Sequence, residues 1–404
     1  IAGSKTGDTF NDTFSGIAID GQKIIITFDK IAPDALLTFT QFAPVPKSEF
    51  EGIDPLQVQQ APFFQHPIGC GPFMVEEVNM KNYTILAPFD KYYNGVADFK
   101  IQLLPSAGDS DPNVVTRAKS GNLDYGYTKM VADVQALEGT PGITVTPIDV
   151  RYTRLFYLNK FDKKDGSPAP LADVRVRQAL RYAIDMETIC ETLFQGSAVP
   201  AHALAPDANL KGGDLNDYNY NPEKAKELLA EANWDPNTVI KAVYYYTDQA
   251  TVDLMTAVQA YLADVGIKME FELVEGDLAT ILWAAPADQT NGPRAVDWDI
   301  CYAANAALSL HEYYDRYRTG SPTNSHTPED AELNRLIDAT NASADVNAQN
   351  EAFKELIKYE NENLFTMALY YQPIFLITSD KIGDIQKGTP QFCINWDIQN
   401  WNVQ

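Results

Sequence analysis

The side chains best suited to acid–base, nucleophilic or metal chemistry are widely scattered in this sequence. None of the four histidines belongs to an HExxH or HxH pattern, in which nearby histidines hold a metal ion. The four cysteines form no CxxC pair, so the spacing excludes a local zinc knuckle and a thioredoxin-type redox motif. The residues concerned are His66, His202, His311, His326, Cys70, Cys190, Cys301 and Cys393.

Motifs for phosphate or acyl-transfer chemistry are absent as well. The sequence contains no GxGxxG or GxxxxGK[ST] loop that would cradle phosphates, and no GxSxG nucleophile elbow. Its 55 acidic residues are so numerous that no pair of carboxylates stands out as a catalytic pair. We therefore expect no catalytic residues, no metal site and no cofactor.

Aromatic residues with a polar tip gather instead at the ends of predicted strands. Such side chains suit a cleft that excludes water and still forms hydrogen bonds. Each of them is equally compatible with ordinary packing in a strand core. The groups are Tyr125 with Tyr127, the segment 152–157, the segment 244–246, and Tyr370-Tyr371-Gln372.

Composition and charge narrow the class of partner. The 404 residues are 45% hydrophobic, which is typical of a folded protein with more than one core, and the net charge is -24. A surface this acidic repels phosphate backbones and anionic lipid headgroups, so we expect no nucleic-acid partner and no polybasic membrane contact. No apolar run approaches the roughly 18 residues that span a bilayer. The polar segment 3–12 does not resemble a signal peptide.

The elements that would position a cleft alternate between strand and helix. Residues 16–30 predict a β-hairpin around Asp20-Gly21, and residues 239–274 predict a strand, a helix and a strand, the βαβ arrangement of an α/β protein. Asp173 and Asn221 have the positions of helix N-caps, and Pro222 follows at the first helical residue. Further strands are predicted at 74–78, 83–86, 99–104, 123–127 and 367–371, and further helices at 112–120, 174–184, 186–194, 222–232 and 347–361.

Five segments resemble, in the same order, motifs of the family 5 extracellular solute-binding proteins. These proteins are the oligopeptide-, dipeptide- and nickel-binding receptors of ABC importers. Cys70 stands where the family has a threonine, and the resemblance extends over nearly the whole chain. The segments are 67–73 (PIGCGPF), 120–124 (SGNLD), 173–185 (DVRVRQALRYAID), 220–232 (YNPEKAKELLAEA) and 266–270 (GIKME).

The resemblance implies an α/β, periplasmic-binding-protein-like fold of type II, in which two lobes joined by two hinge crossings close around a ligand. Lobe I would comprise residues 1–154 and 373–404, and lobe II residues 155–372. Full members of the family begin with a further block, whereas residues 16–17 already resemble the strand that follows it. We therefore expect the N-terminal part of lobe I to be missing and apolar surface to be left uncovered.

The function implied by the resemblance is that of a receptor that captures a peptide or peptide-like solute and delivers it to ABC permease subunits. Such a receptor is extracellular, either a cell-surface lipoprotein or periplasmic, and would meet the membrane only through a lipid anchor that is not in this chain. Two alternatives stay open. One is a binder of a metal chelate or another non-peptide solute. The other is a sensor or chaperone that uses the same cleft without a permease.

The residues aligned with the family's ligand site differ from the peptide-binding branch. That branch places an Asp after a Gly-Trp pair to hold the peptide's α-ammonium, but here Asn305 and Leu308 occupy these positions. A buried ammonium without its carboxylate costs several kcal/mol, so we do not expect recognition of a free peptide N-terminus. Backbone hydrogen bonds to a peptide remain available. His311 lies in the loop where nickel-binding relatives place a histidine.

The candidate ligand-binding residues are those expected near the two crossings. They are Tyr127, Phe156, Tyr157, Asn305, His311, Tyr370 and Tyr371.

Overall fold

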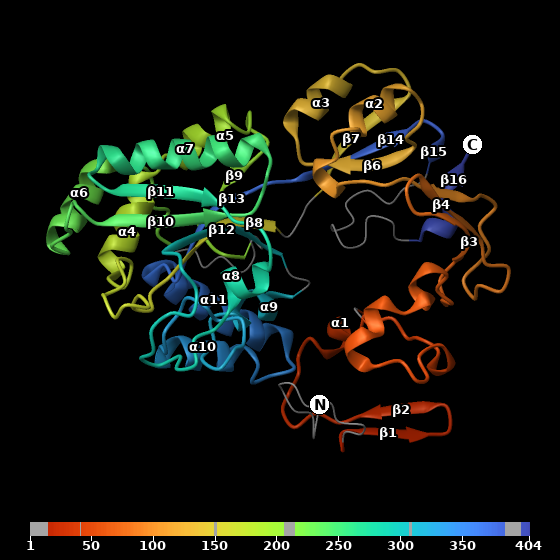
Figure 1. Ribbon diagram of the computed structural model, residues 1–404, viewed down its shortest axis with the longest axis horizontal. Helices are drawn as coiled ribbons and strands as arrows, with labels where there is room; N and C mark the ends of the chain where they lie inside the picture. Colours follow the sequence, from red (N-terminus) through yellow and green to blue (C-terminus); the bar gives the residue numbers. More distant parts are fainter. Residues whose placement is uncertain (1–14, 41, 149–151, 206–214, 307–308, 384–396) are drawn as a thin grey trace.

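The computed structural model describes residues 15–40, 42–148, 152–205, 215–306, 309–383 and 397–404. In this part of the chain the strands form one six-stranded sheet, two three-stranded sheets and two two-stranded pairs. The six-stranded sheet and its helices lie on one side of the molecule, and the smaller sheets lie on the other (Figure 1). Helices and strands alternate along the chain, which confirms the α/β class.

The six-stranded sheet is mixed, with the order β11-β10-β12-β8-β13-β9. Strand β10 is parallel to β11 and β12, whereas β8 is antiparallel to both β12 and β13. Helix α7 connects the parallel strands β10 and β11, which confirms the predicted βαβ unit. The strands are β8 (Tyr152–Leu158), β9 (Val199–Pro200), β10 (Val239–Tyr244), β11 (Lys268–Leu273), β12 (Ile300–Ala306) and β13 (Thr366–Tyr371).

Helices cover both faces of this sheet. Residues of α4 to α7 share one apolar core with Phe156 and Leu158, and residues of α8 to α11 share a second core with Leu155 and Tyr157. Strand β8 contributes to both cores because successive side chains of a strand point to opposite faces. The helices are α4 (Val174–Ala183), α5 (Met186–Thr192), α6 (Pro222–Glu231), α7 (Gln249–Asp264), α8 (Leu278–Trp283), α9 (Leu310–Asp315), α10 (Ala331–Thr340) and α11 (Val346–Asn363).

Capping residues begin two of these helices as the sequence predicts. The Asp173 side chain accepts a hydrogen bond from the backbone N–H of Arg175 at 2.8 Å. The Asn221 side chain accepts one from the backbone N–H of Lys224 at 2.9 Å, and Pro222 is the first residue of α6. These caps satisfy backbone donors that have no partner within the helix, so the start of each helix is set locally.

The smaller sheets carry the N- and C-terminal parts of the chain. The order β6-β14-β7 places the late strand β14 between two early strands, and α2 and α3 pack on it through a small apolar core. The predicted hairpin is confirmed as β1 and β2. The elements are β1 (Ile17–Asp20), β2 (Lys23–Ile26), α1 (Ala35–Phe39), β3 (Phe73–Asn79), β4 (Tyr83–Pro88), β5 (Ile101–Leu103), α2 (Val114–Lys119), β6 (Tyr125–Thr128), α3 (Val131–Leu137), β7 (Ile143–Ile148), β14 (Ile374–Ser379), β15 (Ile382–Gly383) and β16 (Asn402–Val403), with 3-10 helices at Lys47–Glu49, Pro55–Gln60, Pro62–Gln65, Gly108–Ser110 and Ile398–Asn400.

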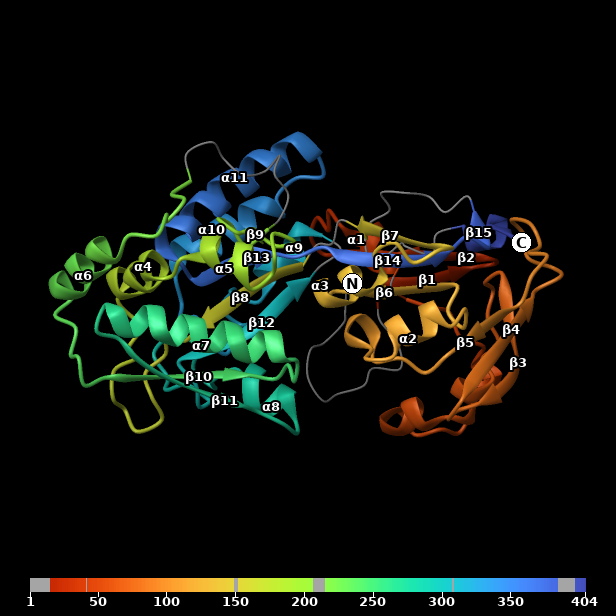
Figure 2. The same ribbon diagram turned by 90° about the horizontal axis from the view of Figure 1, so that it is seen from above.

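The chain passes twice between the three-stranded sheet of β6, β14 and β7 and the six-stranded sheet. It leaves the smaller sheet after β7 and enters the larger one at β8, and it returns from β13 to β14 through Gln372 and Pro373. Figure 2 shows β13 and β14 running almost end to end from one side of the molecule to the other. The exact division into residues 1–154 with 373–404 and residues 155–372 stays a prediction.

Apolar side chains of the N-terminal elements are exposed to solvent. Ile19 and Ile24 in the hairpin and Leu36 in α1 are among the most exposed large hydrophobic residues of the described chain. Figure 1 shows the hairpin apart from the larger sheets. The predicted absence of an N-terminal block is not tested by this arrangement and stays a prediction.

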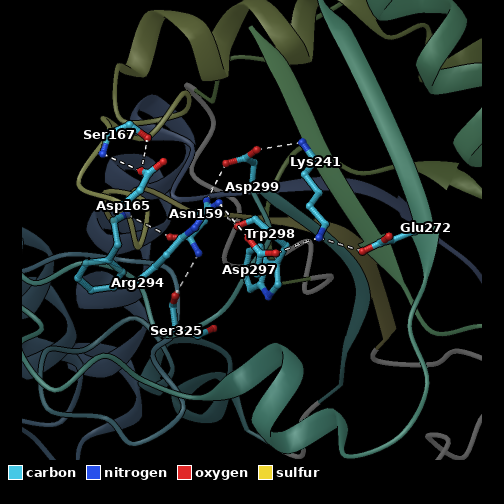
Figure 3. A network of polar contacts seen from close by, with 11 residues as sticks. Asn159, Asp165, Ser167, Lys241, Glu272, Arg294, Asp297, Trp298, Asp299 and Ser325 are labelled. Atoms are coloured by element: carbon cyan, nitrogen blue, oxygen red, sulfur yellow. Dashed lines mark hydrogen bonds and ion pairs between the residues drawn. The ribbon is translucent and has the colours of Figure 1, made fainter.

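A buried ion pair ties the end of β8 to β10 and β12 (Figure 3). The carboxylate of Asp299 accepts hydrogen bonds from Arg294 Nη1 at 2.7 Å and from the backbone N–H of Lys241 at 2.9 Å. The Asp299 carbonyl accepts a further bond from the backbone N–H of Asn159 at 2.8 Å. Arg294 and Asp299 are 4% and 0% exposed, so their mutual attraction offsets the cost of removing both charges from water.

We expect Asp299→Ala to lower the free energy of unfolding by about 3–5 kcal/mol, because it leaves the buried Arg294 guanidinium with only the exposed Asp297 carboxylate, 3.8 Å away. Urea denaturation measures the change. The exposed pair Lys354–Glu351 provides the control, and Glu351→Ala should have little effect because solvent screens that pair. Equal, small effects of both substitutions would show that the buried pair is not a structural requirement.

A buried acid on α11 makes stability depend on pH. Glu360 is 3% exposed, and burial raises its pKa to about 8, while the Thr366 backbone and the charge of Lys160 act in the opposite direction. Lys160 is buried as well, and its Nζ donates to the carbonyl oxygens of Leu158 at 2.5 Å and Phe365 at 2.8 Å. The folded chain therefore binds the Glu360 proton more tightly than the unfolded chain does.

Because the folded pKa of Glu360 lies above its ordinary value of 4.5, its contribution to stability is complete below that pH and is lost as the pH rises through about 8. We expect Glu360→Gln to remove this loss, so that the variant gains stability relative to the wild type between pH 5 and pH 8. Urea denaturation at several pH values across this range gives the difference. A constant difference between the two proteins would contradict the prediction.

Candidate ligand-binding site

A pocket lies where the chain passes between the two sheets. It contains about 280 Å³ of atom-free space that opens to solvent. Its walls come from β8, β12 and β13 of the larger sheet, from the start of α7, and from residues that flank β6 and β14 of the smaller sheet. The lining residues are Lys129, Met130, Arg154, Phe194, Asp248, Ala250, Thr251, Tyr302, Tyr370 and Gln372.

Lys129 joins the two sides of the pocket. It follows β6 directly, and its Nζ lies 3.8 Å from Asp109 Oδ1 on the same side and 3.5 Å from Asp248 Oδ2 at the start of α7. The side chain of Gln372, in the connection between β13 and β14, donates to the Lys129 carbonyl at 3.1 Å. Asp248 is also the N-cap of α7, since its carboxylate accepts a hydrogen bond from the backbone N–H of Thr251 at 3.0 Å.

Arg154 supplies a second positive charge from the larger sheet. It lies on β8 and is 6% exposed. Its guanidinium carbon is 4.8 Å from the centre of the Tyr246 ring and 5.9 Å from that of Tyr152, distances at which a cation is attracted to an aromatic face. In the described part of the chain Arg154 forms no ion pair with a carboxylate, so its forked donors are open to the pocket.

Two tyrosine hydroxyls complete the polar wall. The hydroxyl groups of Tyr302 and Tyr370 are 2.6 Å apart and form a hydrogen bond. Burial raises the pKa of Tyr370 to about 12 and that of Tyr302 well above its ordinary value. Both side chains are therefore neutral at physiological pH. One hydroxyl donates to the other, and the second proton is available to an acceptor in the pocket.

Of the seven predicted ligand-binding residues, Tyr370 lines this pocket. Phe156 and Tyr157 are neighbours on β8 but are buried in the two separate cores, on opposite faces of the sheet. The Tyr157 hydroxyl accepts a hydrogen bond from Arg316 Nη1 at 3.2 Å. Asn305 is 1% exposed, and its amide donates to the Tyr313 carbonyl at 3.4 Å. Leu308 lies outside the described residues.

The remaining predicted residues lie apart from the pocket walls. The Tyr371 hydroxyl donates to the carbonyl oxygen of Ala203 at 2.6 Å. His311 packs against the Phe353 ring with the ring centres 4.9 Å apart, and burial lowers its pKa. Tyr127 is half-buried on β6, opposite Leu376 of β14. These positions do not form one cluster, and whether they contact a ligand stays a prediction.

The strongest polar groups of the pocket, Arg154, Lys129 and Asp248, are missing from the predicted set. A signal for Arg154 is present in the sequence, because it is the only charged residue in the run YTRLFYL at 152–158. A charge in an otherwise apolar strand points to a buried partner or a ligand. Lys129 and Asp248 carry no comparable signal, since each is one of many charged residues in a loop.

Searches for other kinds of site were negative within the described residues. There, no three side chains of the His, Cys, Asp or Glu type lie close enough to hold a metal ion together. Cys190 and Cys301 are buried free thiols and Cys70 is an exposed one, whereas Cys393 lies outside the described part. No helix in this part is long and apolar enough to cross a membrane.

The sequence matches known families over most of its length. The sequence model of the bacterial extracellular solute-binding proteins, family 5 Middle, matches residues 2–327. A protein of Brucella ovis that carries the provisional name of an ABC transporter peptide-binding protein is 28% identical over 275 residues, which are 66% of this chain and 50% of that protein. The chain thus spans about half the length of the curated relatives it matches.

Solved structures share the fold. The oligopeptide-binding protein AppA of Bacillus subtilis, in complex with a nonapeptide, has a TM-score of 0.77 at 18% identity, covering 96% of this chain and 78% of that chain. NikZ of Campylobacter jejuni, in complex with Ni(L-His), has a TM-score of 0.75 at 17% identity, covering 96% of this chain and 79% of that chain. These likenesses confirm the predicted periplasmic-binding-protein-like fold.

The family match extends over more than half of the chain, and it agrees with the motifs that the sequence carries in the same order. The chain belongs to the bacterial extracellular solute-binding proteins of family 5.

Proposed function

We propose that this chain is the solute-capturing part of an ABC importer, and that it holds a peptide or a peptide-like small solute in the pocket between its two lobes. The observation that carries the proposal is the pocket itself. Its walls come from both sheets, on either side of the two passages of the chain. A ligand that contacts both walls favours a closed arrangement of the lobes by its differential affinity for that arrangement.

The chemistry of the walls suits a peptide. Neutral tyrosine hydroxyls and the Gln372 amide provide donors and acceptors that match a peptide backbone, and aromatic side chains provide apolar contact area. Contacts of this kind tolerate varied ligand side chains. Asp248 is already engaged with Lys129 and with the start of α7, which supports the expectation that a free peptide ammonium is not held here.

A metal chelate is the second candidate ligand. The fold is shared with a protein that was solved with a nickel–histidine complex, so a chelate with a polar shell is an alternative occupant of the same pocket. A sensor or chaperone would use the pocket without a permease. We favour transport because the Brucella relative is named as a peptide-binding protein of an ABC transporter. The permease subunits, the extracellular location and a lipid anchor belong to this proposal.

Hinge closure is part of the proposal, and two contacts identify where the lobes would meet. Lys129 pairs with Asp248 beside the pocket, and the Ser309 hydroxyl, at the start of α9, donates to the Asp34 carboxylate at 2.8 Å. Asp34 does not line the pocket. A change in ligand affinity upon substitution of Asp34 would therefore act through the balance between open and closed forms.

Capture of ligand tests the proposed function. Native mass spectrometry of the chain mixed with a tryptic peptide pool, or with nickel and L-histidine, should show a bound solute, and a ligand at 100 times its Kd should raise the free energy of unfolding by about 2.7 kcal/mol. We expect Ala250→Trp to abolish capture because it fills the pocket. Ala260→Trp, on an exposed position of the same helix, should leave capture unchanged. The proposal would be contradicted if the wild type captured neither a peptide nor the nickel–histidine complex.

The contribution of closure is tested by Asp34→Ala. We expect this substitution to weaken the affinity for the captured ligand about fivefold, because the closed form loses a hydrogen bond to a charged group while the open form loses nothing. Isothermal titration measures the affinity. Asp124→Ala is the matched control, since Asp124 accepts a hydrogen bond from Ser379 at 2.9 Å within the smaller sheet and should not affect closure. Equal affinities of the two variants would rule out the Asp34 contact as part of the closed form.

A further inference from the structure

We propose that Arg154 is a carboxylate-binding subsite, so that the ligand of this pocket carries a carboxylate group that lies against the Arg154 guanidinium. The inference rests on the proposed function only in placing the ligand in this pocket. It specifies a chemical group that the ligand must contain and the residue that recognises it.

Arg154 is a buried cation without an anionic partner in the described part of the chain. It is 6% exposed, and it faces the pocket from the middle of the larger sheet. The other buried arginines have acceptors within the protein: Arg294 pairs with Asp299 at 2.7 Å, and Arg177 and Arg181 donate to backbone carbonyl oxygens. A buried charge is costly unless it is paired. The aromatic faces of Tyr246 and Tyr152 compensate for part of this cost and orient the guanidinium, but they leave its N–H donors unused.

The two aspartates nearest the pocket are committed elsewhere. Asp109 and Asp248 both pair with Lys129, and Asp248 also caps α7 through Thr251. Lys129 therefore forms ion pairs with two carboxylates, whereas Arg154 forms none within the described residues and receives the charge of Asp109 only at longer range. The two cations and the two aspartates together carry no net charge, but both aspartates pair with the same cation. A ligand carboxylate at Arg154 would complete the pairing without displacing an existing contact.

The geometry favours a carboxylate over a phosphate. A guanidinium is a planar fork that matches the two oxygens of a carboxylate, and such paired hydrogen bonds are shorter and stronger than neutral ones. The Tyr302 and Tyr370 hydroxyls stay protonated and offer one further donor next to the fork. A phosphate carries up to two charges, and the nearby Asp109 and Asp248 carboxylates oppose that additional charge.

The first experiment uses small anions on the whole chain and needs no knowledge of the natural ligand. Thermal unfolding is measured in sodium acetate, sodium phosphate and sodium chloride at equal ionic strength. We expect acetate to raise the Tm of the wild type above its value in chloride, and to have no such effect on Arg154→Gln. Arg117→Gln, which removes an arginine outside the pocket, should respond like the wild type. The inference is overturned if acetate raises the Tm of Arg154→Gln as much as that of the wild type, or if it does not raise the Tm of the wild type at all. It is also overturned if phosphate raises the Tm of the wild type more than acetate does.

The second experiment separates this inference from the proposed function. A tryptic peptide pool and the same pool converted to methyl esters are offered to the wild type, to Arg154→Gln and to Arg154→Lys. We expect the wild type to bind esterified peptides at least tenfold more weakly, and Arg154→Gln to show no preference. Arg154→Lys should retain a partial preference because it keeps the charge but loses the fork.

Each outcome of the second experiment has one meaning. Equal capture of both pools by the wild type overturns the carboxylate subsite and leaves the receptor function intact. If the wild type captures no peptide but acetate still raises its Tm through Arg154, the proposed peptide-receptor function is contradicted and the carboxylate subsite is supported. Circular dichroism of the Arg154 variants confirms that they fold, so that a lost preference reflects the side chain and not the structure.

Discussion

Strand β8 is hydrogen-bonded along both edges and covered on both faces, and the pocket depends on this position. Its neighbours are β12 and β13, and the residues from Thr153 to Leu158 are buried. A strand in such a place has no access to bulk water, so a charged side chain on it must find a partner or face a cavity. Arg154 faces a cavity, the pocket between the two sheets. The strand that joins the two cores of the larger sheet thus also places a cation at the wall of the pocket.

The pocket combines this rigid wall with a more adaptable one. Arg154, Tyr302 and Tyr370 come from adjacent strands of one sheet, whose register holds them in place. Lys129 comes from the segment between β6 and α3, and Gln372 comes from the connection between β13 and β14. Donors on a rigid sheet define what is recognised, while contacts from connecting segments respond to the relative position of the lobes. The buried Arg294–Asp299 pair supports the rigid wall from the residue that precedes β12.

Residues close to the two passages of the chain differ in what their side chains contact. The motifs of the sequence agree with the family match, whereas the positions of the hinge crossings stay a prediction. Near the passages, however, neighbouring residues point to opposite faces of a strand, so proximity to a hinge does not select pocket residues. Tyr157 lies on the face opposite Arg154 and is a core residue, and Phe156, on the same face as Arg154, is covered by the core of α4 to α7, whereas Arg154 faces the pocket.

The sequence by itself determined the features that depend on near neighbours in the chain. The caps at Asp173 and Asn221 and the hairpin at Asp20-Gly21 follow from contacts within a few residues, and the structure contains them. The composition of the pocket was decided only by the tertiary structure. The sheet order β11-β10-β12-β8-β13-β9 differs from the order along the chain, and it alone brings Arg154 next to Tyr302 and Tyr370. Whether a buried charge is paired depends on such distant neighbours, because electrostatic and hydrogen-bond partners are set by distance in space and not by separation in sequence.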